Sequence, residues 1–94
     1  MTIKTKKIDT SKLLDNEEII LIALNDAIDD GDAKYLMALL DDIAKVRGMT
    51  NLAKETGLNR ESLYKTFSGA RDPKFSTLAK ILPALGYKLH IERA

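Results

Sequence analysis

The chain has 94 residues, enough for one domain with a modest hydrophobic core. Hydrophobic residues make up 45% of it, which is typical of a folded globular protein. Cysteine is absent, which excludes disulfides, thiol nucleophiles and thiolate metal sites. The longest apolar run, residues 19–24, is too short to cross a bilayer, and the N-terminus lacks the apolar core of a signal peptide. We therefore expect a cytoplasmic protein with no membrane partner.

The small net charge of +1 hides a strong asymmetry along the chain. Residues 1–43 contain five basic and ten acidic side chains, a net charge of −5. Residues 44–94 contain ten basic and four acidic side chains, a net charge of +6. An acidic half joined to a basic half indicates two partners of opposite charge, or two solvated faces that neutralise each other.

The first half of the chain predicts a polar arm followed by two helices. Residues 1–14 lack a hydrophobic period and are expected to form a flexible arm before a domain over 15–94. Apolar residues then recur at helical spacing over 16–30 and again over 33–47. Asp32 is placed to cap the second of these helices.

Two short helices are predicted next, separated by a glycine. The first covers 51–56 with Thr50 as its cap, and Gly57 ends it. The second starts after Asn59 and ends by Gly69. Together they form a candidate helix-turn-helix over residues 49–69.

The C-terminal part predicts one more helix and a strand. Ser76 is expected to cap a helix over 77–85, with Pro83 weakening its last turn, while Phe75 is expected in the core. Residues 87–92 alternate between apolar and polar side chains, as in a half-buried strand. A lone strand needs a partner, so we expect it to pair with a second copy or to lie frayed on the core. The residues assigned to dimerisation are Tyr87, Leu89 and Ile91.

The turn at Gly57 resembles the helix-turn-helix of the Cro/phage-repressor family. Ala53 is small where the second helix crosses the first, Gly57 allows a positive φ, and Leu63 is placed to be buried. The resemblance implies an all-α, five-helix fold of the lambda-repressor type, to which the C-terminal strand would be added. The family often has an aliphatic residue where Thr66 stands; here the apolar residue is Phe67, so a small rotation of the recognition helix is expected.

The exposed side of this second helix is the predicted DNA-binding surface. Arg60 suits a guanine edge, Asn59 an adenine edge or the backbone, and Lys65 a base or a phosphate. Glu61 is better explained as a capping or ion-pair residue than as a reader of cytosine. The full predicted set is Thr50, Asn51, Asn59, Arg60, Glu61, Ser62, Tyr64, Lys65, Arg71 and Lys74.

Nothing in the sequence predicts catalysis, a cofactor or a metal site. The single histidine, His90, has no cysteine to share a metal with and falls on the polar side of the expected strand. The clustered aspartates coincide with helix ends and lack the spacing of a calcium loop. Glycine-rich phosphate loops and nucleophile motifs are missing as well. We therefore expect a binding protein and not an enzyme.

A longer resemblance covers most of the chain. The segments "RGM", "LAKETGL", "RESLYK", "DPKFSTLAKIL" and "ALGYKL", with the earlier "LDNEEIILIALNDAIDDGD", resemble the HigA-like helix-turn-helix antitoxins of addiction modules. This resemblance implies two partners. One is a small basic toxin, usually a ribonuclease of RelE/ParE-like fold, and the other is the double-stranded operator DNA of the module's own promoter, bound by a homodimer.

The N-terminal arm carries apolar side chains that could anchor a toxin by folding on binding. An alternative for the last two of them is docking on the protein's own helices. Two other functions remain open: a phage-type repressor without a toxin, and an interaction module that has lost DNA binding. The residues assigned to toxin binding are Ile3, Ile8, Leu13 and Leu14.

Overall fold

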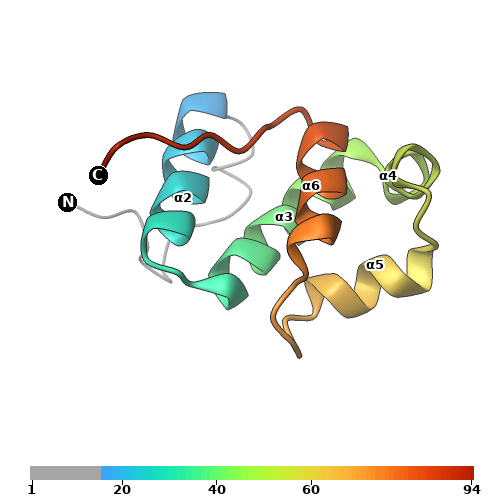
Figure 1. Cartoon of the computed structure of the whole chain (residues 1–94). Coiled ribbons are helices and arrows are strands. Elements are labelled where there is room, and N and C mark those ends of the chain that lie inside the picture. Colours follow the sequence, from blue (N-terminus) through green and yellow to red (C-terminus); the bar gives the residue numbers. More distant parts are fainter. Residues whose placement is uncertain (1–15) are drawn as a thin grey trace.

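A computed structural model describes residues 16–94. In this part of the chain all regular structure is helical, so the all-α prediction holds (Figure 1). Helices α2 and α3 pack side by side, α3 also contacts α4 and α5, and α6 packs against α4. The helices are α2 (Glu17–Asp29), α3 (Ala33–Arg47), α4 (Met49–Thr56), α5 (Arg60–Phe67) and α6 (Phe75–Ala84).

The first two helices begin at side-chain caps, and the second of these is the Asp32 cap expected from the sequence. The Asn16 side chain accepts hydrogen bonds from the backbone N–H groups of Glu18 (3.0 Å) and Ile19 (3.2 Å). The Asp32 carboxylate accepts one from the N–H of Tyr35 at 3.0 Å. Each cap satisfies donors that the first helical turn leaves without an intrahelical partner.

The hydrophobic core is centred on α3. Met37, Leu40 and Ile43 are fully buried along one side of this helix. They meet Leu63 from α5 and Ile81 from α6, which are also fully buried. Burying a side chain of this size stabilises a fold by ~1.5–3 kcal/mol, so this cluster holds the helices around α3.

Two predicted helix starts are wrong by two residues. The helix expected from 51 begins at Met49, so Thr50 lies in its first turn and does not cap it. The helix expected from 77 begins at Phe75, and Ser76 is no cap either. Neither helix uses a side-chain cap. Exposed first-turn N–H groups can bond to water instead, so cap residues do not mark these starts.

Phe75 is not part of the core, contrary to expectation. Its exposed fraction is 71%, while Leu78 is half-buried and Leu82 is buried on the same helix. Phe75 is the first residue of α6, one turn before the positions that face α3 and α4. Helical spacing places Phe75 near the side of α6 that carries Leu78 and Leu82, but the core does not extend to this first turn.

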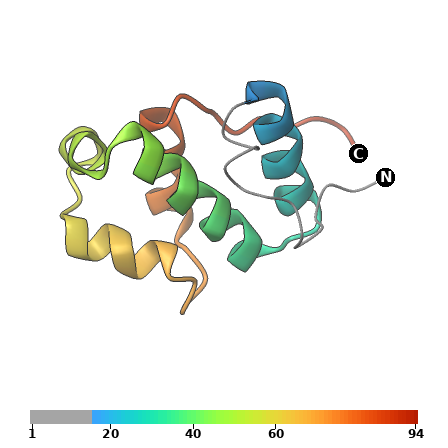
Figure 2. The same ribbon diagram turned by 180° about the vertical axis from the view of Figure 1, so that it is seen from behind.

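The predicted C-terminal strand is wrong. The described chain contains no strand, and residues 87–94 follow α6 as an irregular tail that crosses α2 (Figures 1 and 2). Tyr87 is half-buried, Leu89 is 40% exposed and Ile91 is 94% exposed. The alternating pattern of residues 87–92 instead belongs to an irregular tail that is anchored to the domain through some of its side chains. It therefore does not indicate a strand that pairs with a second copy.

The anchor of the tail is a polar cluster formed by Glu17, Arg47 and Tyr87. The Tyr87 hydroxyl donates a hydrogen bond to the Glu17 carboxylate at 2.5 Å. The Arg47 guanidinium donates to Glu17 at 3.1 Å and to the Tyr87 hydroxyl at 3.2 Å, and its carbon lies 5.2 Å from the centre of the Tyr87 ring. Arg47 also donates to the backbone carbonyl of Leu85. The cluster therefore joins α2, the end of α3 and the tail.

Candidate nucleic-acid interface

The corner between α4 and α5 is set by Gly57. It adopts a left-handed conformation, with φ of 74° and ψ of 6°, which a residue without Cβ reaches at little steric cost. The Thr56 hydroxyl is buried at this corner, where it donates to the Leu52 carbonyl (2.7 Å) and accepts from the Leu58 N–H (3.2 Å). These bonds fix the direction in which α5 leaves the turn.

Helix α5 is held by one cap and one apolar side. The Asn59 side-chain oxygen accepts a hydrogen bond from the Ser62 N–H at 2.7 Å. Leu63 is fully buried and Phe67 is 5% exposed, as predicted. Thr66, where the repressor family often has an aliphatic residue, is half-buried and donates to the Ser62 carbonyl at 2.9 Å. The opposite side of α5 is consequently free to face solvent.

Four of the predicted DNA-contact residues lie on that exposed side of α5: Arg60, Glu61, Tyr64 and Lys65. The Arg60 guanidinium donates a hydrogen bond to the Tyr64 hydroxyl at 3.3 Å, which steers it along the helix. Glu61 pairs with Lys65 at 3.7 Å, in agreement with the ion-pair alternative. Both side chains of this pair are about four-fifths exposed, so solvent screens it and leaves Lys65 available.

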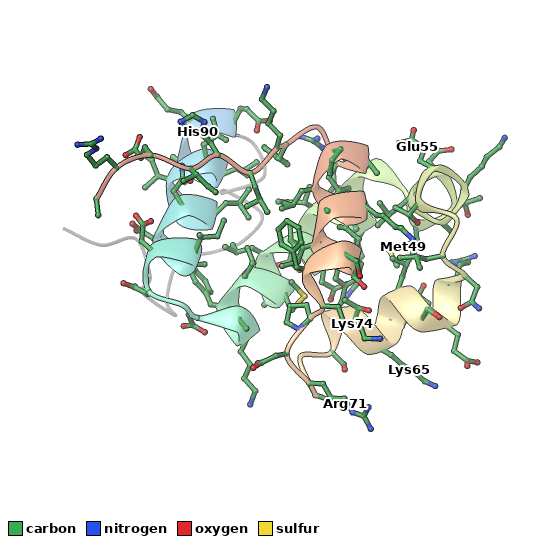
Figure 3. The ribbon with its side chains drawn as sticks, in the orientation of Figure 1. Met49, Glu55, Lys65, Arg71, Lys74 and His90 are labelled. Atoms are coloured by element: carbon green, nitrogen blue, oxygen red, sulfur yellow. The ribbon has the colours of Figure 1, made fainter. Side chains whose placement is uncertain are left out.

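A groove of about 580 Å³ runs beside α5, between that helix, the α5–α6 loop and the start of α6. Lys65, Arg71 and Lys74 surround it (Figure 3), with Asp72 as the acidic residue of its lining. The hydroxyl side chains of Ser62, Thr66, Ser68 and Thr77 also line it, together with Leu58, Ala70 and Pro73. Three cations and several donors around one groove suit an anionic backbone.

Thr50 and Asn51 are exposed in the first turn of α4. Met49, just before them, is buried and fixes the start of the helix (Figure 3). Because no side chain caps α4, its first N–H groups and the positive end of its dipole remain unused by the described chain. This helix start could bind a phosphate, as the sequence suggested for these two residues.

Sequence reasoning missed three hydroxyl groups of the groove, Thr66, Ser68 and Thr77. The four-residue spacing of Ser62 and Thr66 places them on one side of α5, which was an available signal. Thr77 comes from α6, and no local pattern relates it to α5. It enters the groove only because the 69–74 loop folds back.

Among residues 16–94, no three His, Asp or Glu side chains are grouped so that they could hold a metal ion. His90 is exposed on the tail, beside α2 and away from the groove (Figure 3). No helix in the same residue range is both long and apolar enough to span a membrane.

Comparison with known proteins decides the family. Residues 4–93 match a family model described as "probable addiction module antidote protein". The chain belongs to this antidote family. An uncharacterized protein from Haemophilus influenzae is 33% identical over 94 residues, which covers all of this chain and 97% of that relative. No solved structure gives a significant match.

Membership of the antidote family implies a toxin partner. The toxin-binding residues predicted on the N-terminal arm cannot be compared with this structure. The whole predicted arm, 1–14, lies outside the described residues. Within 16–94, the antidote protein presents an acidic helix, α2, at one end and the basic groove at the other (Figure 1). The arm residues concerned are Ile3, Ile8, Leu13 and Leu14.

Proposed function

We propose that this antidote protein neutralises a toxin and represses its own operon by binding operator DNA. The observation that carries the DNA-binding part is the exposed side of α5 next to the basic groove. Arg60 and Lys65 project from a short helix whose other side is buried, and Arg71 and Lys74 flank it. A helix that presents cations in this way can enter a major groove while the loop contacts the phosphates.

The proposal also names the class of antitoxin and the class of its toxin. The sequence resembles HigA-like antitoxins, and the corner at Gly57, the cap at Asn59 and buried Leu63 support the proposal that α4 and α5 act as a helix-turn-helix. The toxin implied by that resemblance is a small basic ribonuclease of RelE/ParE-like fold. The chain itself would act by binding and not by catalysis.

The operator would be a palindrome bound by two copies on half-sites about one DNA turn apart, ~34 Å. Because residues 87–92 form no strand, the tail does not supply a sheet between those copies. Repression is therefore proposed on the basis of α5 and its groove, with no role for a C-terminal strand.

The test combines a pull-down with a DNA shift assay. The full chain is tested against the purified product of the neighbouring gene and against its own upstream DNA at several salt concentrations. Binding to both, with DNA affinity falling as salt rises, supports the proposal because counterions are released from the phosphates. Binding to DNA alone would make it a plain repressor, and binding to neither would contradict both roles.

Single substitutions separate base reading from phosphate contact. Arg60→Ala should cost ~1–3 kcal/mol of DNA-binding free energy at one base position, whereas Arg71→Ala should weaken binding to all sequences alike. Arg93→Ala, which removes an exposed arginine from the tail, is the matched control and should bind as the wild type does. Equal effects of Arg60→Ala and Arg93→Ala would exclude α5 as the reading helix.

A further inference from the structure

The exposed side of α2 is unusually apolar for a surface helix. Leu21 and Ile22 are each 44% exposed and Ile28 is 40% exposed, although the buried side of the helix already fills its place in the core. Grouped exposed hydrophobic side chains of this kind mark contact surfaces more often than single ones do. We call this surface the α2 face; it consists of Glu18, Leu21, Ile22, Asn25, Ile28 and Asp29.

The apolar character continues from the α2 face into a neighbouring cavity. Ile28 and Leu89 line a hollow of about 370 Å³ whose other walls come from α2, the α2–α3 turn, α3, α6 and the loop before α6. Leu36 and Leu82 form part of its floor. A partner that covers the α2 face could thus also insert an apolar side chain beside Ile28.

The charge around the α2 face is strongly negative. Residues 16–33 contain six carboxylates and no lysine or arginine. The tail that crosses α2 adds Lys88, Glu92 and Arg93, a net charge of +1, and Arg47 pairs with Glu17, so the region remains acidic by four charges. An apolar surface within such a field attracts a cationic partner and speeds its approach.

The same charge argues against two other occupants. DNA is a polyanion and would be repelled by the α2 face. A second copy across a two-fold axis would place acidic residues such as Glu18 and Asp29 near their own equivalents, which costs free energy. The remaining occupant with suitable chemistry is a different protein with a basic, partly apolar surface.

We propose that the α2 face is the docking surface for the toxin, and that the toxin contacts it through basic residues around an apolar centre. This inference rests on the proposed antitoxin function and names the surface that serves it. It places the toxin on a different side of α3 from α5 (Figure 1), because α2 packs on α3 without contacting α5. Toxin and DNA would then be bound without sharing a residue.

The decisive variant is Ile22→Lys, with Val46→Lys as its matched control. Both replace an exposed β-branched residue within a helix, since Val46 is 66% exposed on α3. The probe is the purified product of the neighbouring gene, and its affinity is measured by calorimetry. Ile22→Lys should weaken binding at least roughly tenfold, the effect expected at the centre of an interface, and Val46→Lys should not. Both variants should keep their affinity for the upstream DNA.

A second measurement covers the case in which Ile22→Lys fails to fold, which thermal melting would reveal. Hydrogen exchange of the wild-type chain, alone and with the same gene product, should then show added protection in α2 and little in α5. If the wild type binds the product but neither Ile22→Lys nor exchange points to α2, the docking surface is wrong and the antitoxin function stands. If the wild type does not bind the product, the antitoxin function fails and this inference fails with it.

Discussion

Helices α2 and α5 are attached to the same central helix but are supported in different ways. α2 packs on α3, and its first turn is tied to the tail through Glu17 and Tyr87. α5 packs on α3 and α4, and a glycine corner directs its path. Helix α2 presents carboxylates and aliphatic side chains to solvent, whereas α5 and its groove present cations and hydroxyls.

This difference teaches that the two surfaces can be damaged separately or together, depending on where a substitution falls. A substitution in α3, the helix that α2 and α5 both contact, should affect both surfaces. A change in the polar cluster should affect α2, and a change at the corner or cap should affect α5. Comparing binding to the neighbouring gene product with binding to upstream DNA measures this separation directly.

The largest effect is expected from Leu40→Ala. Leu40 is fully buried on α3, so its truncation leaves a cavity between the helices that α3 holds together. The free energy of unfolding should fall by ~2–5 kcal/mol, and both binding activities should be lost at the same temperature. Chemical denaturation followed by both binding assays tests this, with exposed Ala38 replaced by serine as the control. Loss of only one activity would mean that the helices are not a single cooperative unit.

A smaller and one-sided effect is expected from Arg47→Ala. This change removes the donors to Glu17, to the Tyr87 hydroxyl and to the Leu85 carbonyl. Because Arg47 and Glu17 are partly exposed, the expected loss of stability is modest, about 1–2 kcal/mol.

Proteolysis and thermal melting should show a looser tail in Arg47→Ala, while the affinity for DNA stays near that of the wild type. Lys45→Ala, on the exposed side of α3, is its control and removes only a surface pair with Asp41. An equal loss of DNA binding in Arg47→Ala would show that α5 also depends on the polar cluster.

The sequence was most informative where local chemistry determines local structure. Asp32 caps its helix, α5 starts directly after Asn59, and Gly57 adopts the positive φ that the turn requires. Leu63 follows from its spacing after that glycine. These features depend on residues only a few positions apart, so a single sequence suffices to predict them.

The sequence failed where distant residues decide the outcome. An alternating pattern at 87–92 is compatible with a strand, but Tyr87 is bound by Arg47 and Glu17, which lie 40 and 70 positions away. Likewise, Phe75 has a core-like residue type, and only the extent of the core shows that it is exposed. Contacts of this range leave no periodic signal in the chain.

The two asparagine caps allow a balanced test. Asn59→Ala removes the cap of α5 and Asn16→Ala removes that of α2, and each should cost ~1 kcal/mol of stability. Asn59→Ala should weaken DNA binding and leave binding to the gene product unchanged, while Asn16→Ala should do the reverse. Denaturation curves and the two binding assays supply the measurements. If both variants lose the same activity, the assignment of one surface to each helix is wrong.

The smallest effect concerns alkaline pH and the anchor of the tail. Burial, together with the hydrogen bond to Glu17, raises the pKa of Tyr87 from its ordinary value of 10.0 to about 12. Because the folded state holds this proton more tightly, the stabilisation is fully present below pH 10 and is lost as the pH rises to about 12. Tyr87→Phe removes the titrating group and its bond to Glu17, so it should be less stable at pH 8 and lose less stability above pH 10. Denaturation at several pH values measures this, with Tyr64→Phe as the control on exposed α5. Parallel curves for the wild type and Tyr87→Phe would show that the hydroxyl does not contribute to the anchor, and α2 would then depend on its packing against α3 alone.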